Sequence, residues 1–406
     1  MKIVNLYFIL TLILITSSSF AKENNRNTEI NSIERKRNTE KQKLTLGIER
    51  RLVYLPLLTN KNVALVVNQT SAIGENHLVD ILLSEKIAVK TIFAPEHGFR
   101  GKADAGEKVK DGVDLKTNLP IISLYGKHKK PTPEDLKGID IVVFDIQDVG
   151  ARFYTYISTL HYIMEACTEN NIKVLVLDRP NPNGHFVDGN VLDLKFKSFV
   201  GMHPIPVVHG MTIAEYAKMI NGEKWLTNGI QCDLTFVKCL NYDRNEIYKL
   251  PIKPSPNLPN SKSINLYPSI CFFEGTQISI GRGTEFPFQV IGSPLTKKIE
   301  TDFTFTPKST SGAKYPKHEN KSCFGLDLRN EKIYNSLDLT LLIQFYNSYK
   351  DKDHFFLENN FIDLLAGTDQ LRKNIQAGKT AKEIKASWEP ALSQFKETRK
   401  KYLLYK

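Results

Sequence analysis

The chain has 406 residues, of which 41% are hydrophobic and 24% are charged. This composition excludes a largely disordered protein, and the length exceeds what one average core needs, so we expect two domains. The formal net charge is +11, but the lysines and arginines are scattered and no basic run is accompanied by stacking aromatics. A nucleic-acid partner is therefore not expected, whereas another acidic partner is compatible with the charge.

The N-terminus has the pattern of an export signal, and we assign residues 1–21 to a signal peptide. Lys2 precedes an apolar run, residues 3–15, and small residues then lead to Ala21. The run is short for a membrane span, although an uncleaved membrane anchor is the alternative. No cysteine lies near the cleavage point, so a lipoprotein is not expected. Cleavage would remove Lys2 and lower the net charge from +11 to about +10. We expect an exported protein, periplasmic or secreted, with no stable membrane insertion, and a flexible polar leader over residues 22–45.

Residues 46–222 alternate between strand-like and helix-like segments. Short apolar runs at residues 63–67, 89–93, 121–124, 139–146 and 173–177 predict buried strands, with a possible further strand at 205–208. Helical spacing covers residues 77–84, 155–167 and 212–220. This order predicts an α/β fold with a Rossmann-like, doubly wound and mostly parallel sheet.

Residues 223–406 have a different character and predict a smaller α+β auxiliary domain with C-terminal helices. A strand-like piece at 234–237 lies near a proline-rich loop. Near the end, Thr380 and Glu383 form the pattern of a capping box, and Pro390 is expected to end that helix and begin another. No internal repeat is present.

Several signatures are absent, and their absence narrows the chemistry. The five cysteines form no C-x-x-C pair, so a zinc ribbon or thioredoxin-type site is not expected and most of them should be buried. The segment after the first strand, residues 68–74, lacks G-x-G-x-x-G, and the chain contains no Walker A, H-E-x-x-H or G-x-S-x-G sequence. We expect carboxylate chemistry with no metal and no cofactor.

Polar side chains follow most of the predicted strands directly. Because the carboxyl ends of parallel strands meet at one edge of a sheet, these side chains should line one cleft, although a single one could be a turn or a helix cap. The candidates there are Asn68, Glu96, His97, Arg100, Asp145, Gln147, Asp148, Arg179 and Asn181.

Glu96 is the strongest catalytic candidate, because Pro95 and the following His97-Gly98 predict a fixed turn that displays it. A carboxyl group in a partly dry cleft can act as a general acid, although a capping or ion-paired glutamate is the alternative. Glycoside hydrolysis needs a second carboxylate, for which Asp148 is slightly preferred over Asp145.

Two further groups of residues could bind a substrate. Arg152, Tyr154 and Tyr156 lie at the start of the helix after the fourth strand. There an arginine can pair with a carboxylate and a tyrosine can stack on a sugar, although either tyrosine could instead be a core residue. In the second domain, Arg282 lies between two glycines in a turn whose backbone can approach another group closely. Glu274 precedes this turn and Thr284 follows it directly.

Five stretches of the sequence, three of them close matches, resemble those of the exo-β-N-acetylmuramidases. The motifs are FAPEHGFRG (residues 93–101), FDIQDVGARFYTY (144–156) and LDRPNPNG (177–184), and residues 274–288 and 361–372 also fit, except that Ile362 precedes Asp363. The resemblance spans residues 47–405. It implies an active site in the cleft between the two domains, with Glu96 in the position of the family's proposed catalytic glutamate. It also implies release of terminal β-1,4-linked N-acetylmuramic acid from the non-reducing end of peptidoglycan chains or muropeptide-derived sugars.

Two alternatives share this sequence pattern. A non-catalytic periplasmic binder of sugars or peptidoglycan fragments would have the same two-domain cleft, and an amidase would act on the same polymer. For the hydrolase, we expect Arg282 or Arg152 to hold the lactyl carboxylate of the sugar.

Overall fold

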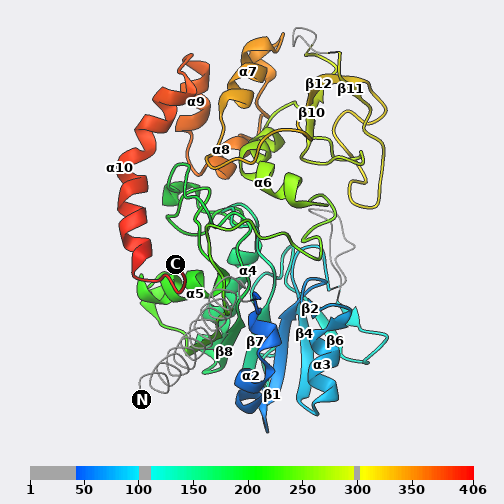
Figure 1. Cartoon of the computed structure of the whole chain (residues 1–406), viewed down its shortest axis with the longest axis vertical. Helices are drawn as coiled ribbons and strands as arrows, with labels where there is room; N and C mark the ends of the chain where they lie inside the picture. The colour runs from blue at the N-terminus through cyan, green and yellow to red at the C-terminus, as the bar shows by residue number, and fades with distance from the viewer. Residues whose placement is uncertain (1–42, 100–110, 297–301) are drawn as a thin grey trace, which may run out of the picture. The chain divides into compact units, whose positions relative to one another are not determined.

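Seven strands form one sheet in the N-terminal part of the molecule, in the order β5-β6-β4-β1-β7-β8-β9 (Figure 1). The computed structural model describes residues 43–99, 111–296 and 302–406, so residues 1–42 and Arg100 lie outside it. Every neighbouring pair in this sheet is parallel except β5 and β6. The strands are β1 (Asn62–Val67), β4 (Ala88–Ala94), β5 (Gly112–Val113), β6 (Pro120–Ser123), β7 (Ile141–Asp145), β8 (Lys173–Leu177) and β9 (Leu234–Val237). The predicted doubly wound, mostly parallel fold is confirmed.

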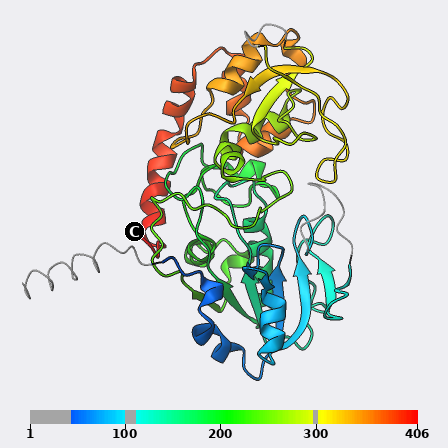
Figure 2. The same cartoon turned by 45° about the vertical axis from the view of Figure 1, so that its right-hand side comes forward.

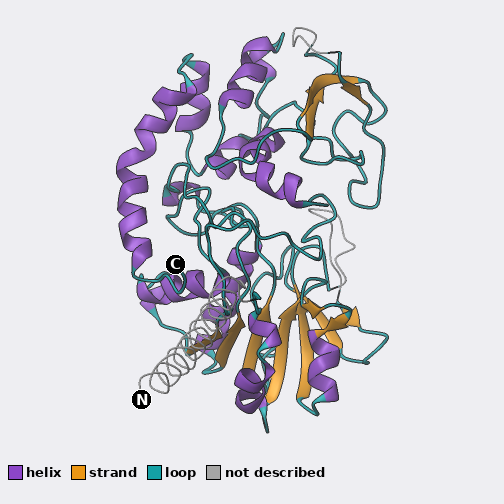
Figure 3. Ribbon diagram, in the orientation of Figure 1, coloured by secondary structure: helices purple, strands orange, loops and turns teal. Residues whose placement is uncertain are grey.

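Helices cover both faces of this sheet, which explains why its central strands are apolar without interruption. On β1, Val63 and Leu65 belong to one core cluster and Ala64 and Val66 to the other. Helices α2 (Arg51–Leu58) and α3 (Leu78–Ser84) pack into the first cluster, whereas α4 (Tyr156–Glu169) and α5 (Ile213–Gly222) pack into the second. Figure 3 shows these helices beside the strands.

Strand β1 lies at the centre of the sheet, and later strands are added on both of its sides. Strands β4 and β6 extend the sheet on one side, and β7, β8 and β9 extend it on the other. Open α/β sheets bind ligands at such a change of direction, outside the carboxyl ends of the strands. The loops after β1, β4 and β7 meet there. A hairpin of β2 (Ala72–Ile73) and β3 (Asn76–His77) follows β1.

A smaller α+β part follows, with its own three-stranded antiparallel sheet in the order β10-β12-β11. The strands are β10 (Val290–Ser293), β11 (Thr304–Phe305) and β12 (Cys323–Asp327), and the helices are α6 (Ser261–Ile270), α7 (Thr340–Ser348), α8 (Phe361–Ala366), α9 (Gln370–Gln376) and α10 (Ala381–Lys400). Short 3-10 helices are η1 (Gly47–Glu49), η2 (Leu194–Phe196), η3 (Thr227–Gly229), η4 (Cys271–Gly275) and η5 (Lys352–His354). Strand β9 comes after residue 222 in the sequence, yet it pairs with β8 as the edge of the main sheet.

Helix α10 ends the chain and differs from the prediction. Its capping box is confirmed, because the Thr380 backbone N–H donates to Glu383 and the Glu383 backbone N–H donates to the Thr380 hydroxyl. However, the helix continues through Pro390 to Lys400, so the predicted break is wrong. Buried Trp388 and Leu392 lie on either side of the proline, and this packing outweighs the lost hydrogen bond. Figure 2 shows α10 running along one side of the molecule toward the C-terminus.

Two smaller predictions also have outcomes. Residues 205–208 form no strand, and Val208 makes only isolated bridges with Ala151 and Asp188. All five cysteines are buried, which confirms the expectation that most of them would be, and all five are free thiols. Across residues 43–99, 111–296 and 302–406, no helix is both long and apolar enough to cross a membrane.

Candidate functional site

A cavity of about 550 Å³ lies where the loops after β4 and β7 meet the C-terminal part of the chain. This volume is typical of small-molecule sites. Five of the predicted site residues line it, namely Glu96, His97, Tyr154, Glu274 and Arg282. Its other lining residues are Tyr125, Gly126, Lys129, Phe153, Thr155, Tyr156, Phe199, Val200, Ser255, Asn257, Leu258, Tyr267, Cys271, Phe288, Phe361 and Leu365.

Glu96 stands on a tight turn at the end of β4. The Gly98 backbone N–H donates to the Pro95 carbonyl at 2.9 Å, and His97 has a left-handed φ of 69°. The Glu96 side chain is half-buried, and its Oε2 accepts a hydrogen bond from the Thr155 hydroxyl at 2.5 Å. Thr155 is the N-cap residue of α4 and makes no side-chain bond to that helix. Its hydroxyl instead orients Glu96, so the carboxyl group is held at the cavity with defined geometry.

Aromatic rings form much of the cavity wall beside Glu96. Tyr154 makes edge-to-face contacts with Tyr156 at 4.8 Å and with Tyr267 at 5.9 Å between ring centroids. Burial raises the pKa of all three phenols well above the ordinary value, so they remain neutral hydrogen-bonding groups. Asn68 was predicted to bind substrate, but its Nδ2 donates to the Tyr156 hydroxyl at 2.9 Å beneath the wall. Such a wall of phenols suits the apolar face and hydroxyl groups of a sugar.

Glu274 and Arg282 reach the cavity from the C-terminal part. The Arg282 guanidinium lies 3.3 Å from Glu274 Oε1, and both side chains are about three-quarters buried. Gly281 and Gly283 have left-handed φ values of 77° and 82°, and a Cβ atom on either would lie within 2.5 Å of a neighbour. Only glycine fits these two positions, so the close approach predicted for this turn is confirmed.

Asp145 and Arg179 do not line the cavity. They form a fully buried bidentate ion pair, with Arg179 Nε and Nη2 at 2.5 and 2.9 Å from the two carboxylate oxygens. Burial alone would lower the pKa of Arg179, but the Asp145 carboxylate outweighs this effect and raises it. The pair holds the loops after β7 and β8 together beneath the site.

Three other predicted residues are occupied by local backbone contacts. Gln147 Nε2 donates to the carbonyls of Asp148 and Pro180. Asn181 Nδ2 donates to the Met211 carbonyl, and the Thr284 hydroxyl donates to the Gly281 carbonyl. These four hydrogen bonds stabilise loops that support the cavity.

Asp148 is buried apart from the cavity lining. Its Oδ2 accepts from the Gly150 backbone N–H at 2.6 Å and lies 3.8 Å from His209 Nε2. Burial raises the pKa of Asp148 to about 7 and lowers that of His209 to about 3. The pair therefore favours two neutral groups, and its position makes Asp148 a poorer candidate than Glu274 for the second carboxylate at the cavity.

Arg152 is fully buried and serves the backbone. Its Nη1 donates to the carbonyls of Asn190 and Ile205, and its Nη2 to those of Leu365 and Ala366 at the end of α8. Burial lowers the pKa of this guanidinium to about 9. The expectation that Arg152 holds a substrate carboxylate is therefore wrong, because four carbonyl oxygens already occupy its terminal nitrogens.

The structure adds site residues that the sequence analysis did not select. Thr155 lies within a motif that it did quote, whereas Lys129 and Tyr267 lie outside all of the quoted stretches. Lys129 Nζ lies 4.6 Å from the centre of the Phe199 ring, and it makes no ion pair within the part of the chain that the structure describes. No local pattern in the sequence distinguishes this lysine from the other lysines near it. The described ranges also hold no group of three or more His, Cys, Asp or Glu side chains placed to bind a metal.

Two glutamates and an aromatic wall line one cavity outside the strand ends of a doubly wound sheet, and this combination suits a carbohydrate-cleaving type of site. Family models agree with this assignment. The exo-beta-N-acetylmuramidase NamZ N-terminal model matches residues 63–262, and the corresponding C-terminal model matches residues 265–405. The chain therefore belongs to the exo-beta-N-acetylmuramidase family and is a glycoside hydrolase.

Individual relatives support the same placement. The chain is 41% identical over 387 residues to the peptidoglycan beta-N-acetylmuramidase NamZ of Bacillus subtilis, covering 90% of this chain and 92% of that protein. Two crystal structures of DUF1343 family proteins from Bacteroides fragilis are also similar. One has a TM-score of 0.83 at 48% identity and the other 0.78 at 30%, covering 90% and 89% of this chain and 99% of each relative.

Proposed function

We propose that this enzyme is an exo-acting hydrolase that releases terminal β-1,4-linked N-acetylmuramic acid from the non-reducing ends of peptidoglycan chains or muropeptide-derived sugars. The observation that carries the proposal is the Glu96 carboxyl group, oriented by Thr155 and half-buried in an aromatic cavity. The printed activity of the Bacillus subtilis relative supports the choice of polymer.

Glu96 acts as the acid/base residue. In hydrolysis of a glycosidic bond, a carboxylic acid protonates the oxygen that leaves with the rest of the chain. The partial burial of Glu96 and the fixed hydrogen bond from the Thr155 hydroxyl suit this role, because they orient the carboxyl group at the cavity.

Glu274 is the second carboxylate in this proposal, in place of Asp148. Both Glu96 and Glu274 line the same cavity and approach it from opposite parts of the chain. Arg282 lies 3.3 Å from Glu274 Oε1 and orients this carboxyl group, whose role is that of a nucleophile or of a base that activates water.

Lys129 holds the lactyl carboxylate that distinguishes muramic acid from its neighbouring sugar. Arg152 is occupied by four carbonyls, and Arg282 faces Glu274. Lys129 lines the cavity and has no acidic partner in the described ranges. A substrate carboxylate would supply the missing counter-charge.

The test is release of free N-acetylmuramic acid from a disaccharide with terminal β-linked muramic acid, comparing wild type with Glu96→Gln. We expect release by wild type and a loss of about a hundredfold or more in the variant. Glu274→Gln and Asp148→Asn form a matched pair, and only the first should lower kcat by a similar factor.

Each contrary result points elsewhere. Full activity in Glu96→Gln would move the acid/base role to another carboxyl group. Tight binding by wild type without any release, measured by calorimetry, would favour the non-catalytic sugar binder. Release of a peptide instead of a sugar, detected by mass spectrometry, would favour an amidase.

Export is the second part of the proposal, since residues 1–21 have the pattern of a signal peptide. N-terminal sequencing of the protein from fractionated cells should find Lys22 as the first residue, in the periplasm or medium. A protein that retains Lys2 and remains with the membranes would contradict cleavage and indicate an anchor.

A further inference from the structure

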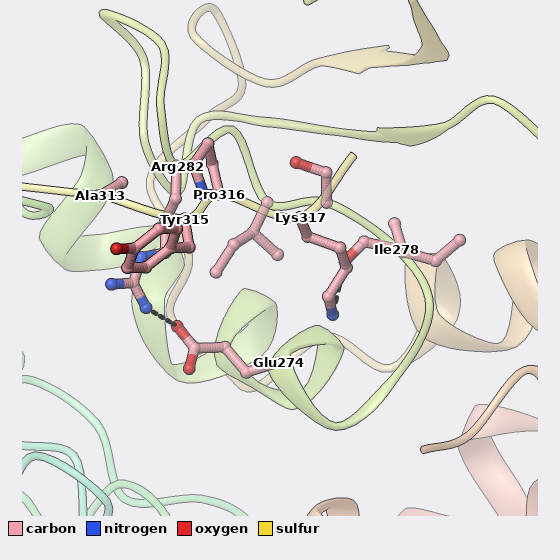
Figure 4. Close-up of a pocket in the computed structure, with 9 residues that line it drawn as sticks. Glu274, Ile278, Arg282, Ala313, Tyr315, Pro316 and Lys317 are labelled. Atoms are coloured by element: carbon pink, nitrogen blue, oxygen red, sulfur yellow. Dashed lines mark hydrogen bonds and ion pairs between the residues drawn. The ribbon is translucent and has the colours of Figure 1, made fainter. Parts of the chain in front are cut away.

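A second cavity, of about 460 Å³, adjoins the Glu96 cavity. The two cavities share Glu274 and Arg282, so this ion pair stands on their common boundary. Figure 4 shows the Glu274 carboxylate turned toward Arg282, with Lys317 farther along the second cavity. Neither the proposed acid/base residue nor the aromatic wall of the first cavity contributes to this lining, which is Glu274, Ile278, Ser279, Ile280, Arg282, Ala313, Tyr315, Pro316 and Lys317.

The second cavity combines one exposed ring with an aliphatic surface. Tyr315 is 92% exposed, which is unusual for a large aromatic side chain. Ile278, Ile280 and Ala313 are buried and supply apolar surface behind it. An aromatic ring at the rim can stack on a pyranose, and an aliphatic surface can receive the methyl group of an N-acetyl substituent.

The charges of this cavity are already compensated. Lys317 Nζ donates to the backbone carbonyls of Phe273, Thr276 and Ile278, which uses its three donors, and burial lowers its pKa to about 8. Arg282 faces Glu274 at 3.3 Å. An acidic peptide needs uncommitted cations, so these contacts favour a neutral ligand with hydroxyl and amide groups.

We propose that this second cavity binds the neutral N-acetylhexosamine on the leaving side of the cleaved bond. The inference rests on the proposed function, because removal of a terminal sugar requires one cavity for that sugar and a neighbouring surface for the sugar that leaves. The bond to be cleaved then lies at the boundary marked by Glu274 and Arg282. Tyr315 becomes a residue that determines affinity for the chain without taking part in the chemistry.

The test compares wild type, Tyr315→Ala and Tyr315→Phe on two substrates. One is a disaccharide of muramic acid linked to N-acetylglucosamine, and the other is β-muramyl fluoride, whose leaving group occupies no sugar site. Because Tyr315 is almost wholly exposed, its replacement should not disturb folding. We expect Tyr315→Ala to raise KM for the disaccharide about tenfold and to leave the fluoride unaffected, whereas Tyr315→Phe, which keeps the ring, should resemble wild type on both.

An unchanged KM for the disaccharide in Tyr315→Ala, or equal changes for both substrates, would overturn the proposal. Failure of wild type to cleave either substrate would reject the proposed function instead. The second cavity is then judged by saturation-transfer NMR with methyl N-acetyl-β-glucosaminide. Binding by wild type and Tyr315→Phe but not by Tyr315→Ala supports the site, and equal binding by all three rejects it.

Discussion

At the scale of single residues, some charged groups near the cavity stabilise the fold, whereas others line the cavity and can contact a ligand. Asp145 and Arg179 neutralise each other in the interior, and Arg152 serves backbone carbonyls. Lys129 has an aromatic ring below it and no acidic partner in the described part of the chain. A ligand group that binds beside Lys129 should therefore be negatively charged.

We expect Lys129→Met to raise KM for β-muramides about tenfold, because a charge-assisted hydrogen bond to the lactyl carboxylate is lost. Inhibition by free N-acetylmuramic acid should weaken by the same factor, and inhibition by N-acetylglucosamine should not change. Lys127→Met is the matched control, since Lys127 is exposed and does not line the cavity. Equal weakening of both inhibitors would remove Lys129 from carboxylate recognition.

Asp148 predicts a pH dependence of stability. Burial raises its pKa in the folded state from 3.8 to about 7, so between these values the unfolded chain releases a proton that the folded chain retains. Stability from this group is present below about pH 4 and is lost as the pH rises to about 7. Asp148→Asn should therefore be more stable than wild type at pH 8, by about 4 kcal/mol at most, and the gain should vanish near pH 4. Urea unfolding at both pH values measures it, and a gain that is constant with pH would contradict the explanation.

At the scale of elements, α8 shows how a distant segment completes the cavity. Phe361 and Leu365 on this helix line the cavity, and Arg152 binds the carbonyls at the helix end. A cation at a helix C-terminus also compensates the helix dipole. Arg152, which is fixed by the N-terminal part, thus positions one wall of the cavity.

Replacing Arg152 with Met should lower the free energy of unfolding on the order of 3–5 kcal/mol, since four buried carbonyl oxygens lose their donor. The KM for muramides and the KM for lactyl-free analogues should rise together, because the wall moves for both. Guanidinium unfolding and steady-state kinetics measure the two effects. A rise confined to muramides would restore the direct role in carboxylate binding that the structure argues against.

The sequence was sufficient to predict the elements whose pattern is local. Strands such as β1 and β8 are continuous apolar runs, and Glu96 follows a strand directly, so their positions could be predicted. The continuity of α10 through Pro390 depends on Trp388 and Leu392 packing against other segments, and the commitment of Arg152 depends on carbonyls from residues 190 to 366. Neither contact leaves a periodic signal, because the partners are far apart in the sequence. For the same reason Tyr267 and Lys129 could not be assigned to the cavity.

At the scale of the whole molecule, Leu404 and Tyr405 bind to buried acidic residues of the N-terminal part. The Tyr405 hydroxyl donates to the buried Asp178 carboxylate at 2.6 Å, and the Leu404 backbone N–H donates to Glu215 at 2.7 Å. Arg244 bonds to both Glu215 and the Tyr405 carbonyl. These C-terminal residues and the loops around Asp178 and Glu215 therefore depend on each other for stability.

Tyr405→Phe should lower the free energy of unfolding by about 1–3 kcal/mol, because Asp178 and the Cys239 backbone N–H each lose a buried partner. The kcat should not change, since none of these groups lines the cavity. Chemical denaturation measures the first effect and the disaccharide assay the second. A lower kcat with unchanged stability would contradict a purely structural role for this contact.

The position of Tyr405 also sets an order of events during synthesis. A chain emerges N-terminus first, and the carboxylates of Asp178 and Glu215 are made about 190 residues or more before Leu404 and Tyr405. Until Leu404 and Tyr405 are made, the central sheet carries buried acidic groups without these donors, and its stability is correspondingly reduced. For a protein exported as proposed, this delay keeps the growing chain closer to the unfolded state that threading through a membrane channel requires.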